Sequence, residues 1–328
     1  MNKFVRVAQT SQSLSLSAME EASRTGRREA DLEHLLLALV ITDQNAGQAL
    51  RELGIDIETA RRAVQEQHEM QLATLGIETQ LPAAGPIVFH ETGGYTWSKR
   101  ATDLLARSSG KGRSGDAAAV LRELVAEPSG LISGILQRLG TTPAEVTSHL
   151  DRIDAARRTP SPRPKKKGRA TMASETFVPA PVDEVWRFVS DPARVPSWEP
   201  SIGEVDTTDH EARVDSVWEG RAPEHRPDGR PTKVRPDFRR RTIELVTAQR
   251  PERAVWRFAY PDAANASPVT TTFDLSATTG GTQVTITLSW SRRPGWRRVV
   301  GIALRPVQKF VMWIMLFQIG GAVSREFR

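Results

Sequence analysis

A basic, proline-rich segment at residues 157–169 divides this 328-residue chain into two parts with different sequence patterns. Before the segment, apolar residues recur at helical spacing, and after it they alternate at strand spacing. Proline breaks regular helices and is excluded from central strands, so the segment is predicted to be a linker. We predict a helical domain over residues 1–154, a linker over 155–170 and a second domain over 171–328, each domain being long enough to bury its own core.

The charge of the chain is concentrated in this linker. Residues 157–169 hold seven Lys and Arg and no acid, whereas the whole chain has a formal charge of +6, so the remaining residues are slightly acidic. We interpret the run as a solvated spacer, with contact to nucleic acid or acidic lipid through Lys165–Lys167 as the alternative.

Several classes of chemistry are excluded by composition. The chain has no cysteine, which rules out disulfides, thiol nucleophiles and cysteine-ligated metals. No two of its histidines have metal-ligand spacing: His34, His68, His90, His149, His210 and His225. The nearest approach to a phosphate loop, Gly110–Gly115, lacks the required spacing. We therefore expect no metal, no cofactor and no ATP hydrolysis.

One segment, Phe310–Val323, is apolar enough to suggest a membrane. Fourteen helical residues span about 21 Å, which is short of a hydrocarbon core of roughly 30 Å. We predict a buried helix there, with an interfacial helix as the alternative. The first ten residues become polar too early for a signal peptide, so a cytoplasmic protein is expected.

The first half is predicted to be helical and duplicated. In the run Asp31–Val40 a capping aspartate precedes a nearly continuous apolar stretch, as in a central buried helix. About 85 residues later Leu121–Val125 repeats the pattern of Leu36–Val40, and Ile135–Gly140 repeats Ala49–Gly54. An all-α domain made of a duplicated four-helix repeat follows.

These residues resemble the Clp repeat domain, the duplicated N-terminal domain of Clp-type unfoldases. The clearest signature is Leu32–Leu39 followed by Leu50–Gly54. The resemblance covers roughly residues 1–154 and implies a platform that docks client peptides or components of the Clp machinery. It also implies that Glu33 and His34 take part in peptide binding, Glu33 matching an acidic position that in some members receives phosphorylated arginine.

The second repeat departs from this pattern. Its Glu-His pair is missing, and Ala118 stands near the position of the glutamate. Recognition through two equivalent sites is therefore doubtful. The structural interpretation of Glu33 and His34 is a charge at a helix start and a packed histidine.

The second half is predicted to be an α+β domain. A short strand at Thr176–Val178 precedes a helix at Pro179–Val189 and a short helix or turn at Asp191–Trp198. Strand patterns follow at Glu204–Thr208, Val214–Arg221, Arg239–Thr247, Ala254–Tyr260, Val269–Ser276 and Thr282–Trp290. Thr278–Gly281 is predicted to close a hairpin, and a long helix runs from about Trp296 to Glu326.

This order is that of a helix-grip fold, a curved antiparallel sheet around a long C-terminal helix. Three segments resemble the START-like, or polyketide cyclase and ligand-transport, superfamily: Val182–Pro192, Trp198–Pro200 and Gly281–Thr285. A sheet curved around a helix encloses a space that suits an apolar ligand. Seven aromatic residues are predicted to contact such a ligand, each with a core role as its alternative: Trp198, Trp218, Phe258, Tyr260, Trp290, Phe310 and Trp313.

Two functions remain open at this stage. The first is a non-enzymatic adaptor or sensor that combines protein docking with a hydrophobic small molecule. The second is a cyclase or aromatase acting on a polyketide-like substrate, which a buried carboxylate or arginine with a perturbed pKa would favour. No catalytic residue is assigned, since strand charges such as Glu219, Arg221, Glu244 and Arg257 usually point away from a core.

Overall fold

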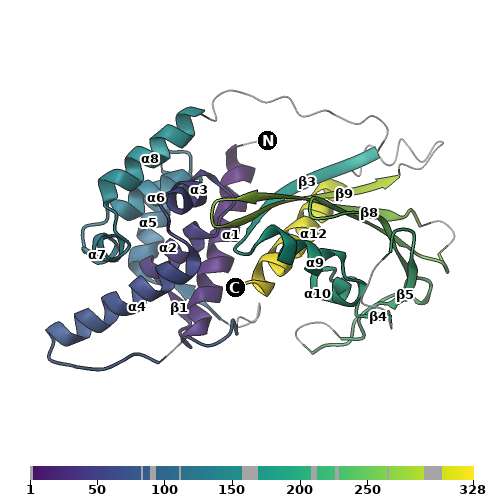
Figure 1. The fold of residues 1–328 in the computed structure, drawn as a ribbon, viewed down its shortest axis with the longest axis horizontal. Helices are drawn as coiled ribbons and strands as arrows, with labels where there is room; N and C mark the ends of the chain where they lie inside the picture. Colours follow the sequence, from purple (N-terminus) through teal and green to yellow (C-terminus); the bar gives the residue numbers. More distant parts are fainter. Residues whose placement is uncertain are drawn as a thin grey trace. The chain divides into compact units, whose positions relative to one another are not determined.

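The computed structural model describes residues 3–82, 84–88, 94–110, 112–156, 169–207, 213–225, 229–263, 266–291 and 305–328. The chain forms two compact units, an N-terminal unit (Met1–Ser161) and a C-terminal unit (Pro162–Arg328). Figure 1 shows the elements of both units. Most of the predicted linker and the histidines at positions 90 and 210 lie outside the described residues.

The N-terminal unit is a duplicated set of four helices, as predicted. The first set is α1 (Lys3–Arg24), α2 (Leu32–Val40), α3 (Asn45–Glu52) and α4 (Ile57–Thr74), and the second is α5 (Lys99–Ser109), α6 (Ala117–Val125), α7 (Leu131–Arg138) and α8 (Pro143–Ala156). Two short strands, β1 (Glu29–Ala30) between α1 and α2 and β2 (Thr96–Trp97) before α5, pair in parallel and link the two sets. Every residue of α2 is buried, which agrees with its apolar sequence.

Within the segment Leu50–Gly54, the side chain of Arg51 ties α3 to the end of α2. Its buried guanidinium donates hydrogen bonds to the carbonyl oxygens of Val40 (2.6 Å) and Thr42 (2.9 Å), which lie at and just beyond the C-terminus of α2. Burial lowers the pKa of Arg51 to about 10. A Cβ on Gly47 would lie 2.1 Å from the carbonyl oxygen of Thr42, so only glycine permits this approach of α3 to α2.

The C-terminal unit is a seven-stranded antiparallel sheet in the order β3-β9-β8-β7-β6-β5-β4. Its strands are β3 (Arg169–Val178), β4 (Glu204–Asp206), β5 (Val217–Arg221), β6 (Arg240–Gln249), β7 (Arg253–Ala259), β8 (Val269–Thr278) and β9 (Gly281–Ser291). Its helices are α9 (Val182–Ser190), α10 (Val195–Trp198) and α12 (Arg305–Glu326), with short 3₁₀ turns η1 (Pro192–Arg194) and η2 (Pro236–Phe238). All six strands predicted after the first helices are present.

The long helix α12 packs along β3 and β9 inside the curve of the sheet (Figure 1). Met312, Leu316, Ile319 and Val323 are buried at helical spacing on the side that meets the sheet. The helix-grip fold predicted from the order of elements is confirmed. The predicted start of this helix near Trp296 lies outside the described residues.

Two of the boundaries that differ from those predicted have a physical explanation. β3 is ten residues long rather than three, because it pairs with β9 along its whole length although Met172–Glu175 carry no strand pattern of their own. The following helix begins at Val182 rather than Pro179, because Ala180 precedes a proline and is disfavoured in helical geometry, and Pro181 itself has an extended ψ of 144°.

We predict that Gly281→Ala destabilises the C-terminal unit. Gly281 has φ +158°, and an added Cβ would lie 2.2 Å from the carbonyl oxygen of Val178, a backbone atom that cannot move freely. Overpacking of this kind costs about 1–3 kcal/mol. Urea unfolding of the full chain, followed by tryptophan fluorescence, measures the change.

Gly321→Ala is the matched control. Gly321 lies in α12 and has open space around its Cα, so alanine there should hold or raise stability by up to about 1 kcal/mol. Equal losses for the two variants would contradict the close approach at Gly281.

Candidate functional site

The predicted peptide residues Glu33 and His34 lie in the first turn of α2 and are buried, with 1% and 5% of their surface exposed. His34 completes a capping box, because its Nδ1 accepts a hydrogen bond from the backbone N–H of Asp31 (3.1 Å). Asp31 in turn accepts hydrogen bonds from the Ser98 hydroxyl (2.6 Å) and from Arg100 Nε (2.8 Å). The start of α2 is therefore tied to the start of α5.

Cationic and imidazole groups surround the Glu33 carboxylate. Its oxygens lie 3.5 Å from Arg27, 3.7 Å from His68 and 3.9 Å from Arg100, all measured to side-chain nitrogens. Oε2 of Glu33 is buried and accepts no hydrogen bond in the described part of the chain. An incoming cation at Glu33 would therefore have to compete with the chain's own Arg27 and Arg100.

We predict that protection of α2 from hydrogen exchange falls as the pH drops below about 6.5. Burial lowers the pKa of His34 from its ordinary 6.5, with partial opposition from the charges of Glu33 and Asp31. The unfolded state then binds more protons than the folded state, so stability is lost as pH falls through this range. Exchange over residues 32–40, corrected for the intrinsic effect of pH, measures it.

His34→Gln is the control for this prediction, since glutamine keeps an acceptor at the third helical position without titrating. The variant should lose less protection than the wild type between pH 5 and 7, the remaining loss coming from His68, whose pKa burial also lowers. A decline in the variant equal to that of the wild type would contradict the assignment to His34.

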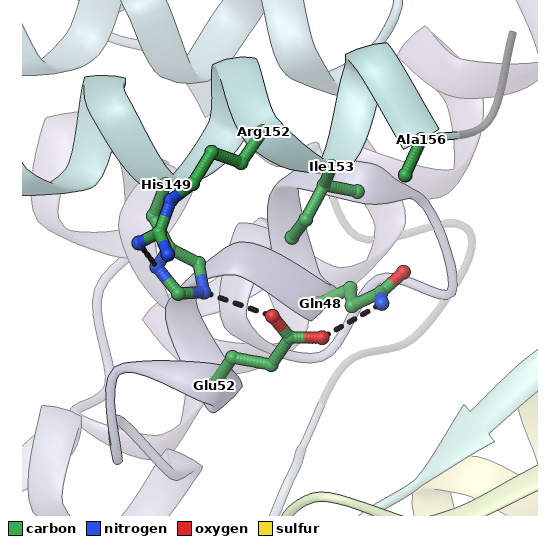
Figure 2. Close-up of a pocket in the computed structure, with 6 residues that line it drawn as sticks. All are labelled: Gln48, Glu52, His149, Arg152, Ile153 and Ala156. Carbon is green, nitrogen blue, oxygen red and sulfur yellow. Dashed lines mark hydrogen bonds and ion pairs between the residues drawn. The ribbon is translucent and has the colours of Figure 1, made fainter.

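A pocket of about 260 Å³ lies between α3 and α8, lined by Gln48, Glu52, His149, Arg152, Ile153 and Ala156. Figure 2 shows its polar side chains bonded to one another. Glu52 accepts hydrogen bonds from Gln48 (2.8 Å) and from His149 Nε2 (2.8 Å), because Arg152 donates to His149 Nδ1 and thereby fixes the tautomer. These groups satisfy one another, so the pocket has no polar group left in need of a ligand.

The concave face of the C-terminal unit carries an aromatic cluster. Trp198, at the end of α10, packs against Trp256 (ring centroids 6.2 Å), Phe258 (6.1 Å) and Phe273 (4.9 Å) from β7 and β8. Trp218 of β5 contacts Trp256 from the other side (5.9 Å). Trp198 and Phe258 are buried core residues, whereas Trp218 is only partly buried.

Beside this cluster, three titratable side chains gather on the same face. Glu199 follows Trp198 and is 2% exposed, and Arg241 lies on β6 and is 6% exposed. Alternation along β6 turns Arg241 to the buried side with Ile243 and Leu245. The Arg241 guanidinium lies 4.4 Å from the ring centroid of Tyr260, which follows β7, in a cation–π contact.

Burial dominates the titration of all three groups. It raises the pKa of the Glu199 carboxyl, against the opposing effects of Ser201, whose backbone N–H donates to Oε1 (3.2 Å), and of the Arg241 charge. It lowers the pKa of Arg241 and raises that of Tyr260, in each case against opposing charges in the cluster. The cluster is a partly compensated charge pair in an apolar setting.

Three buried donors on or beside this face lack acceptors. Arg241 Nε, Trp198 Nε1 and the Thr271 hydroxyl make no hydrogen bond within the described residues. Thr271 is the β8 residue paired with Trp256, so it shares the face of the aromatic cluster. Buried donors are normally satisfied in folded proteins, so these three groups are candidates to bind an acceptor oxygen of a ligand.

The remaining predicted ligand residues lie at different depths. Trp290, at the end of β9, is partly buried against the core. Phe310 and Trp313 lie on α12, where their rings are 6.0 Å apart, and Phe310 is 59% exposed to solvent. The structure thus brings Trp198, Trp218, Phe258 and Tyr260 to the polar cluster, while Phe310 faces solvent.

The strand charges named from the sequence point outward, as expected. Glu244 and Arg257 form an ion pair (2.5 Å) on the convex face, and Glu219 and Arg221 are exposed. Arg241 was not predicted from the sequence, although its alternation with Ile243 and Leu245 is a signal that places it on the buried side.

Two known protein families match parts of this chain. Residues 169–312 match the family model described as polyketide cyclase/dehydrase and lipid transport, and residues 8–86 match that of the Clp repeat (R) N-terminal domain. The chain joins a Clp repeat domain to a polyketide cyclase-type domain. Both resemblances seen in the sequence are thereby confirmed, the Clp match covering the first repeat.

No curated protein matches the chain. Among solved structures, the di-domain ARO/CYC StfQ from the steffimycin biosynthetic pathway is 14% identical, covering 61% of each chain with a TM-score of 0.34. Protein CV1439 from Chromobacterium violaceum is 20% identical, covering 47% of this chain and 96% of its own with a TM-score of 0.32. At these values neither likeness bears on function.

Two further kinds of feature are absent from the described residues. They contain no group of three or more His, Cys, Asp or Glu side chains placed to hold a metal ion. Among them there is also no helix with the length and apolar character needed to cross a membrane.

Proposed function

We propose that the chain is a non-enzymatic adaptor or sensor whose cyclase-type domain holds a hydrophobic small molecule. The Clp repeat domain, at residues 1–154 by our proposal, docks a client peptide or a component of the Clp machinery. The linker over 155–170 keeps the two domains, the second over 171–328, on one chain.

The observation that carries the ligand proposal is the set of unsatisfied donors on the concave face. Arg241 Nε, Trp198 Nε1 and the Thr271 hydroxyl sit in an apolar, aromatic setting with no acceptor among the described residues. Leaving such a group unpaired costs about 1–3 kcal/mol, so a bound oxygen would be strongly favoured there.

The chemistry of the face suggests the class of ligand. Arg241 favours an anionic or strongly polarised oxygen, such as a carboxylate, phenolate or enolate. Trp218, Tyr260 and Trp290 are partly buried and suit an aromatic or otherwise apolar body. We assign these residues, with Trp198 and Phe258 as the packed floor, to the ligand site.

The docking role is supported by the Clp repeat match and by the architecture of α2. We retain Glu33 and His34 as the proposed peptide residues, with access that requires displacement of Arg27 or Arg100 from the carboxylate. A peptide bearing a doubly charged phosphorylated side chain would meet two cations at this position.

A cyclase-like enzyme is the second candidate, favoured by one observation. Burial raises the pKa of Glu199, so its protonated form is more populated than that of an ordinary glutamate and can donate a proton to a substrate oxygen. This role requires that Glu199→Gln keep the bound molecule but lose its conversion.

We predict that 1-anilinonaphthalene-8-sulfonate, an apolar fluorophore with one anionic group, binds the full chain with a stoichiometry of one. Arg241→Gln should weaken its binding about tenfold, because a charged hydrogen-bond donor is lost. Fluorescence titration measures the dissociation constant, and the native unfolding midpoint verifies that each variant is folded.

Arg257→Gln supplies the control, since Arg257 occupies the neighbouring strand but faces outward against Glu244. It should leave the dissociation constant unchanged. The ligand proposal fails if both arginine variants bind the fluorophore as the wild type does.

A further inference from the structure

The helix α12 carries apolar side chains on two sides. Met312, Leu316 and Ile319 face the sheet and are buried. Phe310, Trp313 and Phe317, at spacings of three and four, form a second row whose successive rings lie 6.0 and 5.9 Å apart with interplanar angles of 30° and 28°. We call this second row the aromatic row of α12.

The aromatic row is open to solvent at its N-terminal end. Phe310 is 59% exposed and its neighbour Val311 is 45% exposed, two of the most exposed large apolar side chains among the described residues. Trp313 and Phe317 are partly buried. An exposed aromatic patch of this kind marks an interaction surface more often than an isolated apolar residue does.

The sequence that flanks the row carries charge of one sign. No Asp or Glu occurs from residue 275 to 325, a stretch that holds seven Lys and Arg. Lys309 and Arg305 lie on α12 about one and two turns before Trp313, and no acid lies in the first turn of the helix. Aromatic and cationic residues therefore coincide at one end of α12.

We propose that this end of α12, centred on Phe310, Val311 and Trp313, docks onto an anionic lipid surface. Tryptophan and phenylalanine favour the boundary between headgroups and acyl chains, and Lys and Arg complement anionic headgroups. Met312, Leu316 and Ile319 hold one side of α12 against the sheet, so only its other side can meet the lipid surface. A second copy of the chain is a poorer partner, because it would bring like charges together.

Co-sedimentation of the full chain with lipid vesicles tests this. The chain should bind vesicles of three parts phosphatidylcholine to one part phosphatidylglycerol at least about tenfold more tightly than pure phosphatidylcholine, and 0.5 M NaCl should abolish the difference. Phe310→Ser with Val311→Ser should weaken binding to the anionic vesicles about tenfold, as should Arg305→Glu with Lys309→Glu.

Val217→Ser is the matched control, because Val217 is 58% exposed on β5 and lies outside the row. It should bind vesicles as the wild type does. Thermal unfolding of each variant verifies that the surface substitutions leave the fold intact.

Three outcomes overturn the proposal. One is the absence of binding to anionic vesicles. Another is loss of binding when Lys165–Lys167 are replaced by alanine while the α12 variants bind normally, which would place the lipid contact in the linker. The third is a wild-type dimer that the Phe310→Ser and Val311→Ser variant converts to a monomer, which would make the row an interface between copies.

Discussion

The burial of Arg241 on a concave apolar face is the constraint on which the cyclase-type domain depends. A guanidinium removed from water needs partners, and here they are the ring of Tyr260, the carbonyl of Phe238 and the charge of Glu199. Its Nε still lacks an acceptor. The domain thus keeps a charged side chain with an unsatisfied hydrogen-bond donor in its core, where apolar side chains would be more stable. Such a loss of stability is expected at a binding site.

The Clp repeat domain uses its buried charges differently. Asp31 caps α2 and receives Ser98 and Arg100 from the second repeat, and Arg51 satisfies the carbonyls at the other end of α2. The bonds to Asp31 join the two repeats, and those of Arg51 join α3 to α2 within the first repeat. At Glu33, one buried carboxylate oxygen accepts no hydrogen bond in the described residues.

Most of the fold could be predicted from sequence because it rests on periodicity. The apolar run of α2, the repeated glycine-ended helix and the alternation along β9 each fix an element locally. The length of β3 could not be predicted, since pairing with β9 and not its own residues extends it. Periodicity carries no information about such partners.

Only part of the candidate ligand site could be predicted from the sequence. Its aromatic members stand out in any sequence, and Trp198 marked the motif that contains Glu199. Which aromatics fill the core and which reach solvent depends on packing, so Trp198 and Phe310 looked alike but lie at opposite extremes of exposure. Glu199 was overlooked because nothing in a Trp-Glu-Pro turn reveals that its carboxylate is buried.

The most direct test of the electrostatic interaction between Glu199 and Arg241 is an NMR titration of the chain labelled with ¹³C at its glutamate carboxyl groups. The Glu199 resonance is assigned by its absence from Glu199→Gln. It should titrate above the ordinary pKa of 4.5 and rise further in Arg241→Gln, because the Arg241 charge lowers it. A Glu199 pKa at or below 4.5, or one that does not change in Arg241→Gln, would contradict the account of this cluster.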